Sequence, residues 1–398
     1  MNICFITYRE NNPYIGGIEN VTYLLSKSFI ERGHKVICVS RINSQKGVYT
    51  PVCKELFCPD ATSFANETNW NFLKSTIEKY HIDIIVNQDS KDKQTIKLCK
   101  KAKDIFPKIK IVTPLHFDLF YEEKGITNNF FIRIKNGNKL SVWIKDISFF
   151  FRYHLYKKYK TAKRVKKELT LIAQSSDFVV FLSQGAKEEA DRLMGQKGNN
   201  KFRVIGNPIV ICNEYKYHKH NEILYVGRIE FGLKRFDRML CIWKEVEEKN
   251  PDWKLIVLGD GGYRNFFEKK AKEFGLTRIH FEGFKDPEEY YKTASIVCLT
   301  SSSEGFAKVL AEAQSYACVP VAFNSFAAIN DIISNTRNGF CIKAFNKHLF
   351  AEQLQVLMND KCYIRTIGEQ ARKDSLRFSV ERIADKWEEM LTTTNYIQ

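Results

Sequence analysis

The sequence lacks the features that mark an exported, disulfide-rich or membrane-spanning protein. Its eleven cysteines are odd in number and scattered singly, and none forms a Cys-x-x-Cys pair, which disfavours a disulfide framework or a cysteine metal site. Residues 1–8 show no basic region leading into a long apolar core, and no run approaches the roughly 18 apolar residues of a membrane span. We therefore expect a cytoplasmic protein without a transmembrane helix.

Several motifs for cofactors and metals are missing as well. No Gly-x-Gly-x-x-Gly follows a predicted strand and no P-loop occurs, which disfavours a dinucleotide-dependent oxidoreductase and a P-loop enzyme. Asp-x-Asp is also absent, and histidines and cysteines do not cluster at metal-ligand spacing. We therefore expect neither a bound cofactor nor a metal that holds a diphosphate.

What the chain does contain is a repeated alternation of short β-rich runs and helical patterns over 398 residues, 44% of them hydrophobic. This pattern and length predict two α/β domains with parallel sheets. Residues 1–206 would form the first domain, 207–378 the second, and 379–398 a helix that packs back on the first. The strands are expected at 3–7, 36–39, 82–86, 111–115, 178–182 and 202–205 in the first sheet, and at 223–226, 254–258, 278–281, 295–299 and 319–323 in the second.

The net charge of +16 is concentrated in one insertion of the first domain, at about residues 130–167. Between 133 and 167 there are twelve Lys and Arg residues against one acid, Asp146, interleaved with aromatic residues. This composition is typical of a segment that binds an anionic membrane surface. A solvated lysine-rich face explains it equally well, and charge alone gives little support for nucleic acid, so we expect no nucleic-acid partner.

Two carboxylates eight residues apart, Glu304 and Glu312, are the most informative pair in the chain. Ser301–Ser303 precede them and could cap a helix whose free amides surround Gly305 and Phe306, a suitable site for phosphate. If both glutamates lie on that helix, about 12 Å of rise separates them. Such spacing suits a ligand with two hydroxyl-bearing rings that flank a diphosphate.

Two cations are expected at the carboxyl end of the strand 223–226. Arg228 follows that strand and Lys234 lies six residues later, where the next helix begins. Fixed cations in this position would stabilise a leaving diphosphate, although an ordinary basic loop is the alternative. Gly16-Gly17, in the first strand-to-helix loop, would let backbone amides approach a phosphate or simply allow a tight turn.

His116 ends the predicted strand 111–115, where a cleft is expected. It could face a ligand or be a hydrogen-bonded structural histidine, and Asp118 could orient it or cap the next helix. The residues by themselves leave these alternatives open.

Taken together, these motifs resemble the family 4 retaining glycosyltransferases of the GT-B fold, in which two Rossmann-like domains face each other across a cleft, and more closely the members that build bacterial surface polysaccharides. The resemblance covers most of the chain, and its final motifs are specific because their order and spacing agree. The matching motifs are Gly16-Gly17-Ile18-Glu19, Val179–Ser183, Gly206-Asn207-Pro208, Gly227-Arg228 with Lys234, Gly259-Asp260-Gly261, Glu282-Gly283-Phe284, and Glu304 with Glu312.

The resemblance implies a role for each matching residue. Arg228 and Lys234 would hold the diphosphate, Glu304 a sugar hydroxyl and Glu312 the ribose hydroxyls. His116 would face the transferred sugar, so that Glu304, Arg228, Lys234 and His116 form the expected catalytic set. The remaining donor-binding residues are expected to be Gly16, Gly17, Gly259, Gly283, Phe284, Gly305, Phe306 and Ala307.

Some positions depart from the family pattern. Arg235 follows Lys234 where glycine is usual, Lys308 stands where an apolar residue is common, and Cys318 replaces a glycine. The donor class is therefore better defined than the donor itself.

The expected activity is metal-independent, retaining transfer of a hexose or N-acetylhexosamine from a nucleotide diphosphate sugar, most simply UDP-linked. The acceptor would be a glycan or a lipid-linked glycan at the inner face of the cytoplasmic membrane. Two alternatives remain open at this point: a nucleotide-sugar epimerase of the same fold, and a non-catalytic polyanion-binding protein built on the basic insertion.

Overall fold

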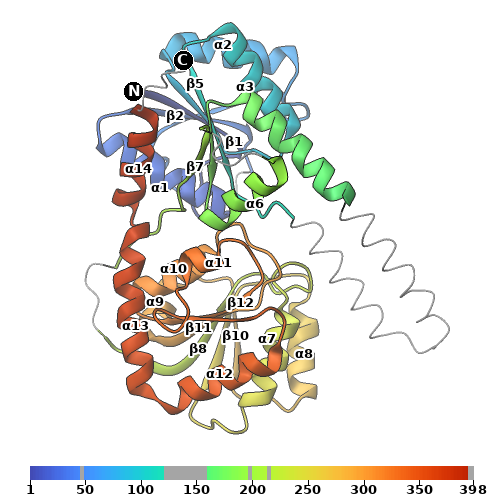
Figure 1. Cartoon of the computed structure of the whole chain (residues 1–398), viewed down its shortest axis with the longest axis vertical. Coiled ribbons are helices and arrows are strands. Elements are labelled where there is room, and N and C mark those ends of the chain that lie inside the picture. The colour runs from blue at the N-terminus through green and yellow to red at the C-terminus, as the bar shows by residue number, and fades with distance from the viewer. Residues whose placement is uncertain (45–48, 121–158, 196–199, 213–216, 393–398) are drawn as a thin grey trace, which may run out of the picture. The chain divides into compact units, whose positions relative to one another are not determined.

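The chain folds into two α/β units, each built on one parallel sheet (Figure 1). The computed structural model describes residues 1–44, 49–120, 159–195, 200–212 and 217–392. One unit contains Met1–Phe117, Arg164–Ile209 and the segment from Phe378 onward, and the other contains Asp118–Lys163 and Val210–Arg377. The predicted fold class, two Rossmann-like domains of the GT-B type, is confirmed.

The first unit has a seven-stranded sheet in the order β3-β2-β1-β4-β5-β6-β7, and every adjacent pair is parallel. This order reverses direction between β1 and β4, as in doubly wound folds. The elements are β1 (Asn2–Arg9), α1 (Gly17–Glu31), β2 (Lys35–Ile42), β3 (Lys54–Phe57), α2 (Glu67–Tyr80), β4 (Ile84–Asn87), α3 (Lys93–Ile105), β5 (Lys110–Leu115), β6 (Phe178–Phe181), α6 (Gln184–Met194), β7 (Phe202–Val204) and α14 (Val380–Thr392).

Alternating side chains of the first sheet face two helical layers. Cys4 and Ile6 of β1 pack with α2 and α3 through residues such as Trp70 and Leu98. Phe5, which points to the opposite face, stacks on Phe29 of α1 with ring centroids 6.3 Å apart. Burial on both faces explains why the central strands appear in the sequence as continuous apolar runs.

The second unit has a six-stranded parallel sheet in the order β10-β9-β8-β11-β12-β13. Phe236, Met239 and Trp243 of its first helix lie fully buried in the core with the strand residues Tyr225 and Val257. The elements are β8 (His220–Val226), α7 (Phe236–Val246), β9 (Lys254–Leu258), α8 (Arg264–Glu273), β10 (Ile279–Gly283), α9 (Glu288–Thr293), β11 (Ala294–Leu299), α10 (Lys308–Ser315), β12 (Val319–Asn324), α11 (Ile329–Ile332), β13 (Phe340–Lys343), α12 (Lys347–Asn359) and α13 (Lys361–Ser375).

Each sheet has one strand that the sequence did not predict. β3 has no apolar run, since its four residues, Lys54–Phe57, are exposed or only partly buried at the sheet edge. β13 is a four-residue edge strand paired only with β12. Short edge strands bury little surface, so their apolar pattern is weak.

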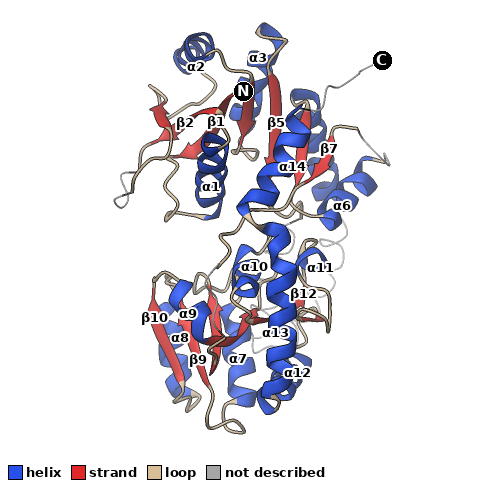
Figure 2. Cartoon of the chain, turned by 90° about the vertical axis from the view of Figure 1, so that its left-hand side faces the viewer, coloured by secondary structure: helices blue, strands red, loops and turns tan. Residues whose placement is uncertain are grey.

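The last helix, α14, belongs to the first unit and packs along α1 (Figure 2). Its Trp387 is buried, and a group of ion pairs joins it to the end of α1. Arg32 Nη1 lies 2.6 Å from Glu388 Oε2 and 2.7 Å from Asp385 Oδ1, while His34 Nε2 lies 2.6 Å from Glu388 Oε1. Burial raises the pKa of Glu388, but the hydrogen bonds from His34 and Arg32 outweigh it and leave that pKa lowered.

This arrangement predicts that Glu388 anchors α14 more strongly than Asp385 does. Glu388→Ala removes the shared partner of Arg32 and His34, whose side chains are 24% and 14% exposed, and should lower the free energy of unfolding by about 1–2 kcal/mol. Asp385→Ala removes an exposed carboxylate and should cost less than about 1 kcal/mol. Urea unfolding of both variants at pH 7 measures the difference, and equal losses would contradict the assignment.

Candidate functional site

Three glycines end neighbouring strands at the carboxyl edge of the second sheet. Gly227, Gly259 and Gly283 follow or end β8, β9 and β10 and have φ angles of 154°, 140° and 77°. A Cβ on Gly259 would lie 2.0 Å from the carbonyl oxygen of Gly227, and the Gly259 amide donates to the carbonyl of Gly283 at 2.7 Å. The turns therefore pack backbone against backbone, which requires glycine irrespective of any ligand.

The loop after β8 carries the two predicted cations and is organised by Glu230. Glu230 Oε1 accepts hydrogen bonds from the amides of Leu233 and Lys234 at 3.2 and 3.3 Å, and its Oε2 lies 3.9 Å from Arg228 Nη1. The Arg228 side chain is 71% exposed. Sequence reasoning missed Glu230, although it lies inside the Gly-Arg-x5-Lys motif and is the only acid between the two cations.

Lys234 and Glu304 form a direct ion pair between the loops that follow β8 and β11. Lys234 Nζ lies 2.8 Å from Glu304 Oε1, and the two side chains are only 20% and 14% exposed. The sequence assigned these residues to different parts of a ligand. The structure brings them together, so the two side chains hold each other in place.

Glu304 does not lie on the helix that contains Glu312. The predicted helix start at Ser301–Ser303 is wrong, because α10 begins at Lys308 with Ala307 as its N-cap residue. Gly305 and Phe306 therefore belong to the preceding loop, and the expected 12 Å of helical rise between the carboxylates does not apply.

The three serines are instead buried in a segment that is bonded to the start of α7. Ser302 donates its amide to the carbonyl of Leu233 at 2.7 Å, and its hydroxyl accepts from Arg238 Nη1 at 3.0 Å. Ser303 Oγ donates to Asp118 Oδ2 at 2.9 Å. Burial lowers the pKa of Arg238 to about 9, and its guanidinium lies 3.9 Å from the ring centroid of Phe345. These contacts fix the segment that leads to Glu304.

Glu312, on α10, is held by two side chains. Lys308, one turn earlier on the same helix, places Nζ 2.7 Å from Glu312 Oε1. The buried Tyr291 donates its hydroxyl to Glu312 Oε2 at 3.4 Å. Lys308, one of the departures from the family pattern, therefore neutralises and orients this carboxylate.

Helices α7 and α10 begin shortly after Lys234 and Glu304, and both have a left-handed residue at the N-cap. Arg235, before α7, has a φ of 51°, and Ala307, before α10, has a φ of 55°. This conformation costs a non-glycine residue about 1 kcal/mol. At position 235, where the resemblance predicted glycine, the Arg235 guanidinium contacts both carboxylate oxygens of Asp237 at 2.8 Å and offsets part of that cost.

Two of the predicted donor-binding residues, Gly283 and Phe284, lie at the end of β10. Gly283 is buried, whereas the neighbouring Phe284 ring is 78% exposed. A Cβ on Gly283 would lie 2.9 Å from Arg264 Nη1. Arg264, on α8, therefore adds a cation close to this turn that the sequence did not single out.

In the first unit, Gly16 is the N-cap residue of α1 and Gly17 its first helical residue. A Cβ on Gly16 would lie 2.5 Å from Glu19 Oε2, so the missing side chain makes room for that carboxylate. Burial raises the pKa of Glu19. Gly17 has open space at its missing Cβ.

His116 follows β5 and is paired with Gln88, which follows the neighbouring strand β4. His116 Nε2 lies 2.5 Å from Gln88 Oε1, and desolvation lowers the pKa of His116 to about 4. The imidazole is therefore neutral near pH 7, and donation from Nε2 to Gln88 leaves Nδ1 as an acceptor. Gln88 is 2% exposed, and its Nε2 has no hydrogen-bond partner among the described residues. No sequence motif marks Gln88.

Most of the basic insertion lies outside the described residues, which resume at 159. Residues 159–175 are helical, and Lys163, Arg164 and Lys166 are exposed while Val165 and Leu169 are buried. No helix in the described part of the chain is both long and apolar enough to cross a bilayer.

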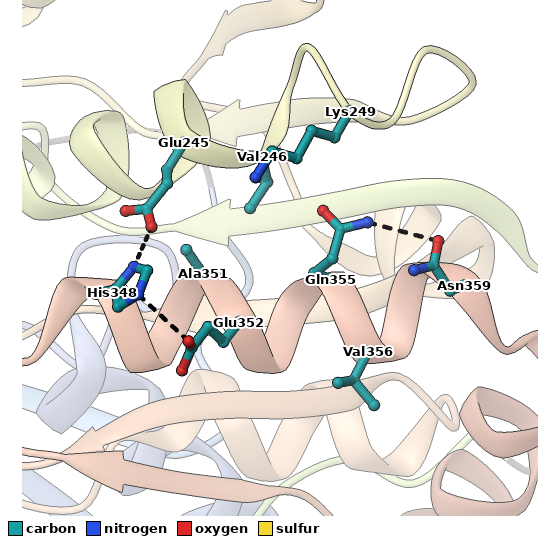
Figure 3. Close-up of a pocket in the computed structure, with 9 residues that line it drawn as sticks. All are labelled: Glu245, Val246, Lys249, His348, Ala351, Glu352, Gln355, Val356 and Asn359. Carbon is teal, nitrogen blue, oxygen red and sulfur yellow. Dashed lines mark hydrogen bonds and ion pairs between the residues drawn. The ribbon is translucent and has the colours of Figure 1, made fainter.

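A groove of about 450 Å³ lies between α7 and α12, away from all of these residues (Figure 3). His348 bridges Glu245 and Glu352 in it, with Nε2 3.3 Å from Glu352 Oε1. Contact with Glu245 raises the pKa of His348. None of the predicted site residues lines this groove, so its presence does not bear on their roles.

Comparison with known proteins agrees with the motifs and the fold. The model of the glycosyltransferase family 4 matches residues 15–211, and the model of the glycosyl transferases group 1 matches residues 213–374. An uncharacterized glycosyltransferase of Haemophilus influenzae is 28% identical over 51% of this chain and 59% of its own length. The amylovoran biosynthesis glycosyltransferase AmsD of Erwinia amylovora is 31% identical over 44% of this chain and 48% of its own.

The chain therefore spans about half the length of these curated relatives. Among solved structures, Anabaena HepE in complex with UDP is similar over 99% of this chain and 100% of its own, with a TM-score of 0.73 and 18% identity. That likeness supports the fold. Because the two family models follow one another along nearly the whole chain, the protein belongs to the family 4 glycosyltransferases of the GT-B fold.

Proposed function

We propose that the protein is a retaining glycosyltransferase that moves a hexose or N-acetylhexosamine from a UDP-linked donor to a glycan hydroxyl during bacterial surface-polysaccharide synthesis. The observation that carries the proposal is the Lys234–Glu304 ion pair at the carboxyl edge of the second sheet, beside the exposed Arg228. Family membership supports it, as do a relative named for amylovoran biosynthesis and a structural neighbour that contains UDP.

The ion pair consists of a hydrogen-bond donor, the Lys234 ammonium group, and an acceptor, the Glu304 carboxylate. A bound nucleotide sugar could separate the two groups. A diphosphate between Lys234 and Arg228 would draw the ammonium group away from Glu304, whose carboxylate would then accept a sugar hydroxyl. Negative charge grows on the diphosphate as the bond to the sugar breaks, so fixed cations stabilise the transition state more than the ground state. The acceptor hydroxyl would attack on the face that the diphosphate leaves, which retains the anomeric configuration.

Glu312 would hold the ribose hydroxyls from the same edge. Tyr291 and Lys308 fix the direction of its carboxylate before the nucleotide arrives, which lowers the entropy lost on binding. Amides of Gly305, Phe306 and Ala307 would contact the sugar and phosphates, and the main chain at Gly283-Phe284 would meet the base. We propose no metal and no cofactor in the reaction.

His116 would contact the transferred sugar as a neutral group. Its Nδ1 can accept a hydrogen bond from a sugar hydroxyl, while Gln88 Oε1 accepts the hydrogen bond from Nε2 and holds the ring in place. A neutral imidazole avoids placing positive charge beside a sugar that becomes positive in the transition state.

The acceptor is proposed to be a lipid-linked glycan, which would bring the protein to an anionic membrane surface. The described end of the basic insertion supports this, because exposed Lys163, Arg164 and Lys166 lie on one side of a helix with a buried opposite face.

Glu304→Gln tests the donor site. It keeps the shape of the side chain but loses the charge, so transfer should fall about 100-fold or more, while UDP affinity stays within about threefold because Lys234 remains available. The donor is first identified by the thermal stabilisation that each of a panel of nucleotide sugars gives the protein. Isothermal titration calorimetry then measures the affinity for UDP. Glu369→Gln, at an exposed carboxylate on α13, is the matched control. Unchanged turnover in Glu304→Gln would refute the assignment.

Gln88→Glu tests the neutral state of His116. A carboxylate next to the ring favours the imidazolium form and should raise the pKa of His116 from about 4 toward or above 6.5. Activity at pH 6 relative to pH 8 should therefore fall in Gln88→Glu and stay near the wild-type ratio in Gln88→Asn. Histidine-labelled NMR titration measures the pKa directly, and a raised pKa without loss of activity at pH 6 would exclude a role for the neutral ring.

Charge reversal of Lys160, Lys163 and Arg164 to Glu tests membrane binding. Flotation with vesicles that contain anionic lipid should fall at least tenfold, because each basic residue near such a surface contributes about 1 kcal/mol. Lys269, Lys270 and Lys272 on α8 changed to Glu give a control with a comparable change of charge. Equal flotation of the two triple variants would count against the surface role of residues 160–164.

A further inference from the structure

Two cysteine sulfurs touch in the first unit, at a place that the proposed reaction does not use. Cys38 is fully buried on β2, and Cys53 is partly exposed immediately before β3. Their Sγ atoms lie 3.3 Å apart, and both cysteines are free thiols. The two strands are adjacent and parallel, with Cys38 opposite Glu55, so the backbone holds the pair in place.

The surroundings of this pair are polar, unlike those of a cysteine that only fills a core. Asn11 Nδ2 lies 3.6 Å from Cys38 Sγ and Ser26 Oγ lies 4.0 Å from it, and both residues are buried. The hydrogen bond between the two thiols lowers the pKa of Cys53 and, together with burial, raises the pKa of Cys38. Cys53 thus combines access to solvent with a stabilised thiolate, the two properties of a reactive cysteine.

We propose that Cys38 and Cys53 form a thiol modification site that reacts with low-molecular-weight disulfides and closes to an intramolecular disulfide. The Cys53 thiolate attacks one sulfur of the small disulfide, forms a mixed disulfide and releases one small thiolate. Cys38 then loses its proton and attacks Cys53 Sγ, which forms the Cys38–Cys53 bond and releases the second small thiolate. The protein is oxidised by two electrons, and the small disulfide is reduced to two thiols.

Closure of the pair acts on the loop that precedes Gly16. Asn11 contacts Cys38 through its side chain and donates its amide to Glu55 Oε1 at 3.0 Å, so it bridges the sulfur pair and β3. The new bond draws the two sulfurs from 3.3 Å to about 2.05 Å. The disulfide therefore ties β2 to the start of β3 beneath residues 10–12, and amide exchange of this loop should slow.

The experiment treats the full-length reduced protein with oxidised glutathione and maps its thiols by alkylation and mass spectrometry. We expect an intact mass lower by two hydrogen atoms, a Cys38–Cys53 linked peptide, and full reversal by dithiothreitol. Cys53→Ser should abolish the link. Cys58→Ser, at a partly exposed cysteine just after β3, should retain it and is the matched control.

Two outcomes would overturn the proposal. One is a glutathione adduct that persists on Cys53 while Cys38 remains alkylatable after unfolding. The other is that Cys53→Ser forms a disulfide-linked peptide through a different cysteine to the same extent as the wild-type protein forms its linked peptide. Amide hydrogen exchange of the reduced and oxidised wild-type protein at residues 10–12 tests the effect on the loop, and unchanged exchange would disprove it. None of these measurements requires the donor sugar, so they are independent of the proposed transferase activity.

Discussion

The contact between the backbones of Gly227 and Gly259 is the constraint on which the carboxyl edge of the second sheet, the proposed donor site, depends. Any side chain at Gly259 would collide with the Gly227 carbonyl, so the turns after β8 and β9 coexist only with glycine there. A second close approach follows, since a Cβ on Gly261 would lie 2.5 Å from the Ile229 carbonyl. The loop that carries Arg228, Glu230 and Lys234 rests on these contacts, and its ion pair with Glu304 depends on them in turn.

Packing and the proposed ligand binding therefore make separate demands on the same motifs. The motif Gly-Arg-x5-Lys contains a glycine that the turn requires and Glu230, which orients the loop. Its two cations supply positive charge, one of them in the ion pair with Glu304. Conversely, the buried serines before Glu304 are used structurally, by Arg238 and the backbone of Leu233. A motif in such a site cannot be divided into structural and functional residues by inspection of its letters alone.

The sequence predicted the fold and the central strands of both sheets well, because strands buried on both faces appear as apolar runs. It placed Arg228 and Lys234 correctly in the loop after β8, but it placed Glu304 on the helix of Glu312 rather than in the loop before it. The roles of these residues as ligand contacts stay predictions. It failed at the start of α10, where three serines resembled a helix cap. Their actual partners are up to 185 residues away in the sequence, as with Ser303 and Asp118, and a local pattern carries no information about them.

The same limit explains the pairs that only the structure revealed. His116 meets Gln88, 28 residues earlier, and Cys38 meets Cys53 because β2 and β3 are neighbours. β3 was not predicted, so the approach of the two sulfurs could not be either. Desolvation of His116, which sets its protonation state, likewise depends on side chains that fold around it.

The left-handed residues before α7 and α10 have a consequence for how the protein could change. Replacement of Arg235 or Ala307 by glycine would relieve a disfavoured backbone conformation but also enlarge the range of shapes open to the loop. Replacement of Arg235 would also remove the two hydrogen bonds from its guanidinium group to Asp237. Arginine at position 235 therefore accepts a disfavoured backbone conformation in return for a stiffer loop before α7, and substitutions at this position would change how readily that loop rearranges.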